Sequence, residues 1–396
     1  MKSQFREFLF EAKHLTGLLV AAATVAVFLY MGVGAVAQSK STLSALPPTP
    51  QAPKDNPTTP AKVALGRLLF WDPLLSGPQD VACASCHHPQ NGYAEDRDLS
   101  LGVTAIGLGS KRRQAPGSSI PIVKRNSPTV LNIAFSGSDQ SGRYDPATAP
   151  MFWDMRVKSL EKQALEPLKA HEEMRGNTYP EDEALAKVVA KLQANAEYRR
   201  LFAGAFGGKR PVNAENLGRA IAAFERTLLA NNSPFDRYMR GDRSAMTEEQ
   251  VSGMQRFERV GCIKCHNGPM FSDYKLHVMG VPDNPALPAS DDGAEKTYAF
   301  RTASLRNLTS TAPYEHNGMF RTLSAVVGFY EDASGGRSRN PNVSSEKLDP
   351  LVRELGEFDE EDVDLVAFLR ALSDDSFDKT IPERVPSGLP VGGKIQ

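Results

Sequence analysis

The chain has 396 residues, and its 46 lysines and arginines nearly balance its 47 aspartates and glutamates, for a formal net charge of −1. This length allows two domains with substantial hydrophobic cores. The near-neutral charge gives no support for binding to nucleic acid. The short run Lys111-Arg112-Arg113 lies in a glycine-rich stretch and is interpreted as a solvated loop.

An apolar run from Leu15 to Ala37 follows a start of mixed charge. It ends in Ala35-Val36-Ala37, a small-residue pattern typical of a secretory cleavage site. The run is also long enough to span a bilayer as a helix. Residues 1–37 are therefore predicted to be a signal peptide or an N-terminal membrane anchor, with cleavage after Ala37 favoured. In both cases the rest of the chain is exported, and the periplasm is the expected location.

Residues 38–60 are rich in proline, serine and threonine, with almost no residues that form a hydrophobic core. This composition predicts an extended or disordered linker. From Ala61 the apolar residues recur at helical spacing until Trp71-Asp72-Pro73 ends the pattern. Residues 89–128 resemble a long loop because glycine and proline interrupt them repeatedly. Helical patterns return at residues 157–168 and 181–206, which completes a predicted first domain over residues 61–208.

A predicted second domain covers residues 209–380, and residues 381–396 are left as a tail. Its helices are expected at residues 214–229, 247–260 and 360–372, with Asp359 as a possible N-cap for the last. No alternating strand pattern of useful length occurs. The expected class is mainly α, with two modules and long loops.

All four cysteines belong to two Cys-x-x-Cys-His motifs, Cys83–His87 and Cys262–His266. This spacing is the attachment signature of c-type haem. The thiols of Cys83 and Cys86, and those of Cys262 and Cys265, would bind the haem covalently. The imidazole of the following histidine would ligate the iron. A zinc ribbon is disfavoured because its cysteine pairs lie about 15–20 residues apart, whereas more than a hundred residues separate these pairs. We expect two cytochrome c-like domains, each with one covalent c-type haem.

The second axial ligand decides whether a haem transfers electrons or binds an oxidant. Apart from His14 and the two proximal histidines, the chain offers His88, His171, His277 and His316. His88 is adjacent to a proximal ligand and cannot reach across the same ring. Periodicity alone does not choose among the other three, the eleven methionines and the ten tyrosines.

Further motifs occur in a fixed order and resemble the bacterial di-haem cytochrome c peroxidase/MauG family over roughly residues 57–375. Besides the two Cys-x-x-Cys-His motifs, they are Val63–Phe70, Arg125–Thr129, Phe152–Asp154, Gln163-Ala164, Glu173-Met174, Phe224–Thr227 and Thr311–Gly318. In that family the N-terminal haem reacts with hydrogen peroxide, and the six-coordinate C-terminal haem stores or relays an electron.

The resemblance also assigns roles to three residues, because Trp153, Gln163 and Glu173 keep the family's ten-residue intervals. It implies that Glu173 is the distal acid/base, which moves a proton between the peroxide oxygens. Gln163 would orient peroxide or a distal water, and Trp153 would lie between the haems. Without the resemblance, an exposed Glu and Gln and a packed Trp would be the simpler interpretation.

Two departures separate this chain from the ordinary peroxidases of the family. Those enzymes carry an iron-capping histidine in a Ser-x-Gly-His loop, where this chain has Val103. Valine cannot ligate iron, so the first haem is expected to be open without reductive activation. Fourteen residues after His316, where those enzymes use a methionine, this chain has Tyr330. MauG-like members ligate the second haem with tyrosine there. Ligation by a methionine, Met319, Met279 or Met270, is the alternative.

The resemblance further implies one calcium ion between the haems, with Asn126 and the carbonyls of Thr311 and Pro313 at its ligand positions. Two smaller departures have no explanation in the sequence. Asn317 replaces the usual aspartate, and Met155 replaces the usual glycine after Trp-Asp.

Three functions therefore stay open. The first, which is the favoured hypothesis, is a MauG-like enzyme that uses hydrogen peroxide to oxidise a protein or another external substrate. The second is a peroxidase that removes hydrogen peroxide with electrons from a small cytochrome c or cupredoxin. The third is a non-catalytic electron-transfer cytochrome, which would need neither Gln163 nor Glu173. Homodimers are common in the family, so a homodimer is a further expectation.

Overall fold

The computed structural model describes residues 42–359 and 361–395. The predicted export segment 1–37 and residues 38–41 lie outside the described residues. Within the described part, no helix is long and apolar enough to cross a membrane. Helices dominate, and the strands form only short two-stranded pairs, as expected for a mainly α protein.

The helices and strands have the following bounds in chain order: α2 Pro60–Trp71, α3 Cys83–Cys86, β1 Ala105–Ile106, β2 Arg113–Gln114, β3 Pro150–Met151, β4 Val157–Lys158, α4 Leu160–Gln163, α5 Ala184–Ala194, α6 Ala196–Phe206, α7 Ala214–Glu225, α8 Pro234–Met239, α9 Glu248–Val260, β5 Leu276–Val278, β6 Ala299–Arg301, α10 Leu323–Ser334 and α11 Val363–Ala371. The antiparallel pairs are β1–β2, β3–β4 and β5–β6.

Local signals explain several of these bounds. Helix α2 begins with Pro60 after the Thr59 cap, as a fixed proline φ favours the first helical turn. Helix α9 begins with a capping box formed by Thr247 and Gln250. It ends at Gly261, whose φ of 95° suits glycine, and the second haem motif follows directly. The last helix starts later than predicted, because Asp362 rather than Asp359 caps α11.

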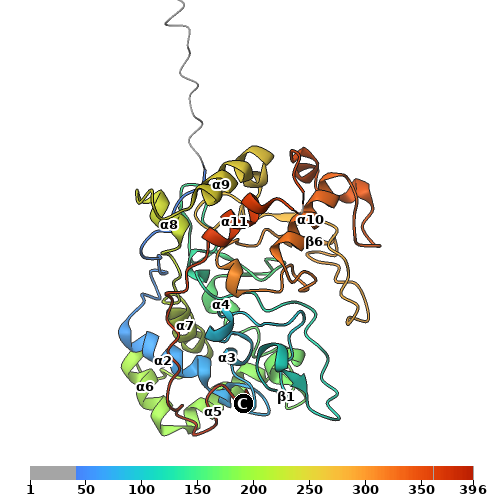
Figure 1. The fold of residues 1–396 in the computed structure, drawn as a ribbon. Helices are drawn as coiled ribbons and strands as arrows, with labels where there is room; N and C mark the ends of the chain where they lie inside the picture. The colour runs from blue at the N-terminus through green and yellow to red at the C-terminus, as the bar shows by residue number, and fades with distance from the viewer. Residues whose placement is uncertain (1–41, 360, 396) are drawn as a thin grey trace, which may run out of the picture. The chain divides into compact units, whose positions relative to one another are not determined.

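A first hydrophobic core gathers α2, α5, α6 and α7, which lie together in the lower half of Figure 1. Its members include Leu65 and Leu69 of α2 and Leu217 and Ile221 of α7. The sequence analysis assigned residues 214–229 to the second domain. The packing contradicts that assignment, because α7 lies against α2. The boundary therefore falls after α7 rather than at residues 208/209.

A second core is built mainly from α8, α9 and α11, in the upper half of Figure 1. Phe235, Phe257, Phe271 and Phe368 meet at its centre, mostly edge-to-face. Such aromatic pairs add stability beyond the area that they bury. The second haem motif follows α9 at the edge of this core.

The described part of the predicted linker is packed rather than free. Leu43 and Leu46 are only 2% and 1% exposed, and Leu43 belongs to the second core. The backbone N–H of Leu46 donates to Asp236 over 2.9 Å. At the other end, the amide of Asn56 donates to Glu161. The prediction of a segment without core residues is therefore wrong from Leu43 onward.

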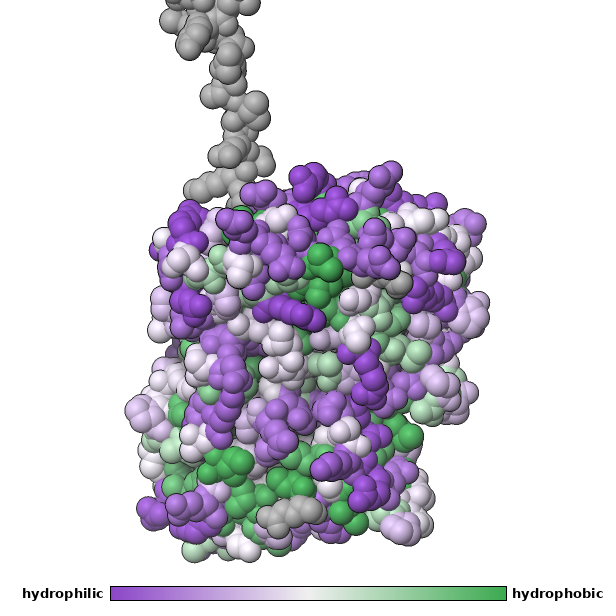
Figure 2. All heavy atoms as spheres, in the orientation of Figure 1, coloured by the Kyte–Doolittle hydropathy of each residue, from purple (hydrophilic) through white to green (hydrophobic). Residues whose placement is uncertain are grey.

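The predicted tail also packs, in a cluster with Phe70 and Trp71 of α2. The Ser85 hydroxyl donates to the Gly392 carbonyl over 2.8 Å, and the Gly392 N–H donates to the Trp71 carbonyl over 2.8 Å. Figure 2 shows mostly polar residues on the visible face, with apolar ones gathered near the end of the chain.

Candidate functional site

The first haem motif forms the short helix α3, and one helical turn places Cys83 and Cys86 on the same side. His87 follows at the end of α3, with its Nδ1 3.1 Å from the carbonyl oxygen of Tyr93. A proton on Nδ1 donates to this carbonyl and leaves Nε2 as the iron-binding atom. Such a partner fixes the tautomer and orientation of a ligating imidazole.

The second motif repeats this arrangement. Cys262 begins a single 3₁₀ turn after α9, and the Nδ1 of His266 lies 2.9 Å from the carbonyl oxygen of Phe271. Both histidines are thus orientated by a backbone carbonyl just after the motif. Burial lowers the pKa of both imidazoles, which favours the neutral form that binds metal. These donors fit c-type haem at both positions.

A cavity of about 250 Å³ adjoins the second motif and is lined by Cys262, Cys265, His266 and Tyr330. The rings of His266 and Tyr330 have centroids 6.5 Å apart at an angle of 68°. Burial, together with the charge of Glu315, raises the pKa of Tyr330 well above its usual value. Two thiols, an imidazole and a phenol therefore converge on one largely apolar space, which suits a haem.

The three alternative methionine ligands occupy different places. Met270 and Met279 line the same cavity as Tyr330. Met270 is buried in a small cluster with Leu46 and Phe135. Met319 packs against a separate cluster around Phe320 and Phe329.

Glu173 lies in a five-residue π-helix, His171–Arg175. Single π turns are rare and often occur at functional sites. Burial and then the neighbouring charge of Glu172 raise the pKa of Glu173 to about 7, while Arg156 opposes this shift. Burial is the main cause of the raised pKa values of Cys83 and Cys86, and the charge of Glu173 adds to both. Glu173 is therefore close to the first motif.

Gln163 is the last residue of α4, the short helix that precedes this π-helix. Glu161 of the same helix accepts a hydrogen bond from Arg226 of 2.5 Å. It also accepts one from Asn56. These contacts fix α4 against α7, the helix that ends one residue before Arg226.

The Val103 side chain is buried in the first core. It is 1% exposed and packs in the same cluster as Leu65, Ile120 and Met174. Its backbone N–H donates to the Glu173 carbonyl over 2.8 Å. The segment that carries an iron-capping histidine in the ordinary peroxidases is therefore attached here to the backbone of Glu173.

Trp153 lines the cavity of the second motif, although its chain segment leads to α4. Its indole N–H donates to the Asn126 carbonyl over 3.1 Å, and its own carbonyl accepts from the N–H of Arg301 over 2.7 Å. Its ring meets His316 edge-on, with centroids 6.5 Å apart. His316 in turn stacks on Phe300 at 3.6 Å. Sequence reasoning missed Phe300, because a single phenylalanine in a loop-rich segment carries no signal.

The three calcium candidates, Asn126, Thr311 and Pro313, line the same cavity. The Asn126 backbone N–H donates to the His316 carbonyl over 2.7 Å, and its side-chain amide donates to the Arg97 carbonyl over 2.9 Å. The fold therefore brings the three residues to one region.

Of the two smaller departures from the family pattern, the structure accounts for Asn317 and not for Met155. Met155 has a φ of 55°, a left-handed conformation that glycine adopts without strain. The Asn317 amide donates to the Pro282 carbonyl over 2.8 Å. A carboxylate could not donate this bond, so asparagine suits its position here.

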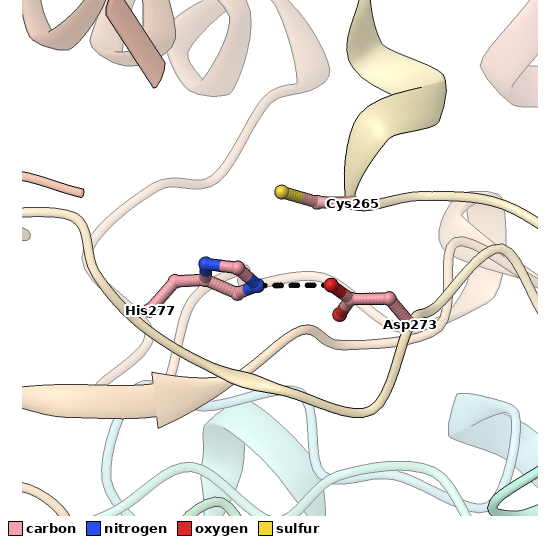
Figure 3. Close-up of side chains that lie close together, drawn as sticks. All are labelled: Cys265, Asp273 and His277. Atoms are coloured by element: carbon pink, nitrogen blue, oxygen red, sulfur yellow. Dashed lines mark hydrogen bonds and ion pairs between the residues drawn. The ribbon is translucent and has the colours of Figure 1, made fainter. Parts of the chain in front are cut away.

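Figure 3 shows Cys265, Asp273 and His277 close together, with geometry that could hold a metal ion. Cys265 belongs to the second haem motif, so this cluster is part of that site. His277 lies 3.1 Å from Asp273 and 2.7 Å from Asp349. The Asp273 carboxylate is the main cause of the raised pKa of His277, and Asp349 acts in the same direction. His277 is thus a charged group between two carboxylates.

Arg112 contradicts the interpretation of Lys111-Arg112-Arg113 as a solvated loop. It is only 2% exposed, and its guanidinium donates to the carbonyls of Ser85 and Gly102. A local charge pattern carries no information on such burial, because tertiary contacts create it.

Comparison with known proteins agrees with this geometry. The family model described as di-haem cytochrome c peroxidase matches residues 60–244. The chain is 36% identical over 337 residues to the methylamine utilization protein MauG of Methylorubrum extorquens, which covers 84% of this chain and 83% of that protein. It is 34% identical over 392 residues to the cytochrome-c peroxidase IdrP1 of Pseudomonas sp. strain SCT, which covers 90% of this chain and 91% of that protein.

A solved structure gives the same result for the fold. A MauG-like protein associated with microbial copper homeostasis superposes with a TM-score of 0.66 at 28% identity. The match covers 84% of this chain and 95% of that one.

Proposed function

The chain belongs to the di-haem cytochrome c peroxidase family, and we propose that within this family it is a MauG-like enzyme that uses hydrogen peroxide. Family membership makes it a peroxidase-type oxidoreductase with two c-type haems. The proposal adds covalent attachment through Cys83 and Cys86 and through Cys262 and Cys265.

His87 would hold the haem that meets peroxide, and that haem, when bound, would supply an iron that binds peroxide and the electrons that cleave the O–O bond. Glu173 receives a proton from one peroxide oxygen and delivers it to the other, so that water can leave. A pKa near 7 suits this exchange, because the group is then present in both protonation states at neutral pH. Gln163 would orient peroxide or the distal water.

The identity and place of Val103 are the single observation that carries this proposal. Valine has no iron-ligating atom, and its side chain is 1% exposed in the first core on a segment bound to the Glu173 backbone, so residue 103 does not supply a cap for the first iron. This supports reaction with peroxide without a preceding reduction step. A pure electron carrier would need a strong sixth ligand on both haems.

The second haem would be held by His266 and Tyr330. A phenolate oxygen is an anionic ligand that favours oxidised iron, so this haem would store an oxidising equivalent. Trp153 and His316 line the same cavity, and Trp153 would connect the two haems. One calcium ion at Asn126, Thr311 and Pro313 remains part of the proposal.

The natural reductant separates two versions of the function. In the first, two electrons come from side chains of a partner protein or from another external substrate. In the second, a small cytochrome c or cupredoxin supplies them and the enzyme removes peroxide. The name of the Pseudomonas relative, cytochrome-c peroxidase, favours keeping the second version. The reaction is proposed to take place in the periplasm, with the enzyme released or anchored by residues 1–37.

Replacement of Glu173 by Gln tests the proposal. Loss of general acid–base catalysis typically slows a reaction by about 10²–10⁴-fold. We expect the second-order rate constant for peroxide, followed by stopped-flow spectroscopy, to fall by at least about 100-fold. Haem content should stay at two per chain. An unchanged rate would remove Glu173 from the mechanism.

A further inference from the structure

A buried arginine connects the first haem motif with the segment that carries Glu173. Arg112 is 2% exposed, and its Nη1 donates to the Ser85 carbonyl over 2.5 Å. Ser85 lies in α3, between the two cysteines of the motif. The Nη2 of the same guanidinium donates to the Gly102 carbonyl over 3.2 Å. One planar group thus holds two backbone carbonyls from separate segments.

Gly102 lies directly against the backbone of the π-helix. A Cβ atom on Gly102 would lie 2.0 Å from the Glu172 carbonyl oxygen and 2.2 Å from that of Glu173. The next residue, Val103, donates its N–H to the Glu173 carbonyl over 2.8 Å. Any displacement of residues 102–103 would therefore be passed directly to Glu173.

The backbone of Arg112 is itself well fixed. Its N–H donates to the Gly109 carbonyl over 2.9 Å, and Arg97 donates to its carbonyl over 2.6 Å. The β1–β2 pair, Ala105–Ile106 with Arg113–Gln114, encloses the turn that leads to it. The side chain therefore projects from a rigid hairpin.

Arg112 also forms a long ion pair with the buried Glu95, whose Oε1 lies 4.0 Å from Nε. Nε itself is buried without a hydrogen-bond partner, so the Nη atoms make the hydrogen bonds of this guanidinium. Burial of a charge is costly unless hydrogen bonds compensate for it. Here the two carbonyls, one on each segment, and the Glu95 carboxylate provide that compensation.

We infer that Arg112 is a positioning residue, which sets the distance between the first haem and Glu173 by bridging Ser85 and Gly102. This inference rests on the proposed role of Glu173. Residues 102–103 would then keep a fixed position on the peroxide-binding side of the first haem throughout the reaction cycle. Only arginine can bridge both carbonyls, because lysine offers a point charge rather than a planar fork.

The test compares Arg112→Lys with Arg113→Lys in the full-length, haem-loaded protein. Arg113 is the exposed neighbour, and its guanidinium donates only to the Lys111 carbonyl. We expect Arg112→Lys to lower the peroxide rate constant by about 10-fold or more, since small misplacements of catalytic groups have large effects. Electron paramagnetic resonance should show a changed high-spin signal from the first haem and an unchanged low-spin signal from the second. Arg113→Lys should leave both the rate and the spectrum unchanged.

A double variant and a substitution at a second site distinguish a positioning role of Arg112 from a general effect on protein stability. In a Glu173→Gln background, Arg112→Lys should change the residual rate by less than about 2-fold, because coupled residues are non-additive. Gly102→Ala should reproduce the lowered rate and the changed high-spin signal. The inference is overturned if Arg112→Lys reacts at the wild-type rate, if it loses a haem, or if its loss of rate is the same in the Glu173→Gln background.

These outcomes also separate this inference from the proposed function. An unchanged rate for Glu173→Gln alone would overturn the role of Glu173 itself. A slow Glu173→Gln with a normal Arg112→Lys would overturn only the bridging role of Arg112.

Discussion

Glu173 is the residue whose environment most directly determines the expected chemistry. Its pKa is raised to about 7 by burial and by the charge of Glu172, with a smaller contribution from Glu166, and Arg156 opposes the shift. If the carboxylate is the form that first accepts a proton, the peroxide rate should rise with pH through about 7 and then level off. Below that pH the protonated carboxyl predominates, and the reaction should be slow.

Substitution of Glu172 by Gln should move this pH profile. Removal of a neighbouring negative charge favours ionisation of Glu173, so its pKa falls and the midpoint shifts to lower pH. Arg156→Gln should shift the midpoint in the opposite direction. Stopped-flow rates between pH 5 and pH 9 measure both shifts. Identical midpoints in all three proteins would contradict this account of the Glu173 pKa.

Met155 offers a test of backbone strain at residue scale. A non-glycine residue in the left-handed region costs roughly 1–3 kcal/mol, and Met155 has a φ of 55°. Met155→Gly and Met155→Ala remove the same side-chain contacts, but only glycine relieves the strain. We expect the glycine variant to be more stable than the alanine variant by about 1 kcal/mol in chemical denaturation. Alanine usually gives the more stable protein of the two. An alanine variant that is more stable than the glycine variant would therefore contradict the strain at Met155.

Residues with a covalent or steric role could be predicted from the sequence, and residues with a tertiary role could not. The spacing of the two Cys-x-x-Cys-His motifs is enough to indicate haem attachment. Valine at position 103 has no atom that can ligate iron, so the residue type alone excludes it as a ligand. Arg112 looked solvated because its neighbours are glycine and charged residues. Only the fold brings Ser85 and Gly102 to its guanidinium.

At the scale of elements, the contact between α2 and α7 depends on glycine. A Cβ on Gly66 would lie 2.0 Å from the Ala220 carbonyl oxygen of α7. The two backbones therefore approach too closely for any side chain. This contact positions α7 and the Arg226 that follows it. Arg226 in turn donates a hydrogen bond to Glu161 of α4, the helix that ends at Gln163.

Gly66→Ala should consequently lower the free energy of unfolding by about 1–3 kcal/mol, the usual range for overpacking a closely packed contact. Gly204→Ala in α6 is the matched control, since nothing lies within 4 Å of its added Cβ. It should raise stability by about 0.5–1 kcal/mol, because alanine is the better helix former. Denaturant titration measures both, and equal effects would contradict the packing argument.

Helical periodicity predicted α2, α7 and α9 well, because each has a clear apolar face and a local cap. It predicted one helical stretch over residues 181–206, whereas the chain forms α5 and α6, with Asn195 between them as the N-cap of α6. It also predicted one helix over residues 157–168, where the chain forms β4 and then the short α4. Periodicity does not reveal which neighbour a helix packs on, so α7 was given to the wrong domain.

At the scale of the whole molecule, residues 43–56 connect the two cores. Leu43 packs in the second core, and Asn56 bonds Glu161 and the Arg219 carbonyl beside the first. Composition alone suggested a free linker, since prolines dominate the segment. Two buried leucines, at 2% and 1% exposure, are enough to fix it.

The double substitution Leu43→Ala and Leu46→Ala should lower the free energy of unfolding by about 4 kcal/mol or more, as each buried leucine contributes roughly 2–5 kcal/mol. Val363→Ala is the control, because Val363 is 67% exposed. It should change stability by less than about 0.5 kcal/mol. A double variant as stable as the control would show that this segment is not held by its leucines.

Electron paramagnetic resonance of the as-isolated ferric protein, combined with mixing of the unreduced protein with peroxide, tests the central claim most directly. The account predicts one high-spin haem at His87, one low-spin haem with His266 and Tyr330 as ligands, and an immediate reaction with peroxide. Tyr330→Phe should change only the low-spin signal. Two low-spin haems, one with histidine and methionine ligands, and no reaction before reduction would contradict the roles of both Val103 and Tyr330.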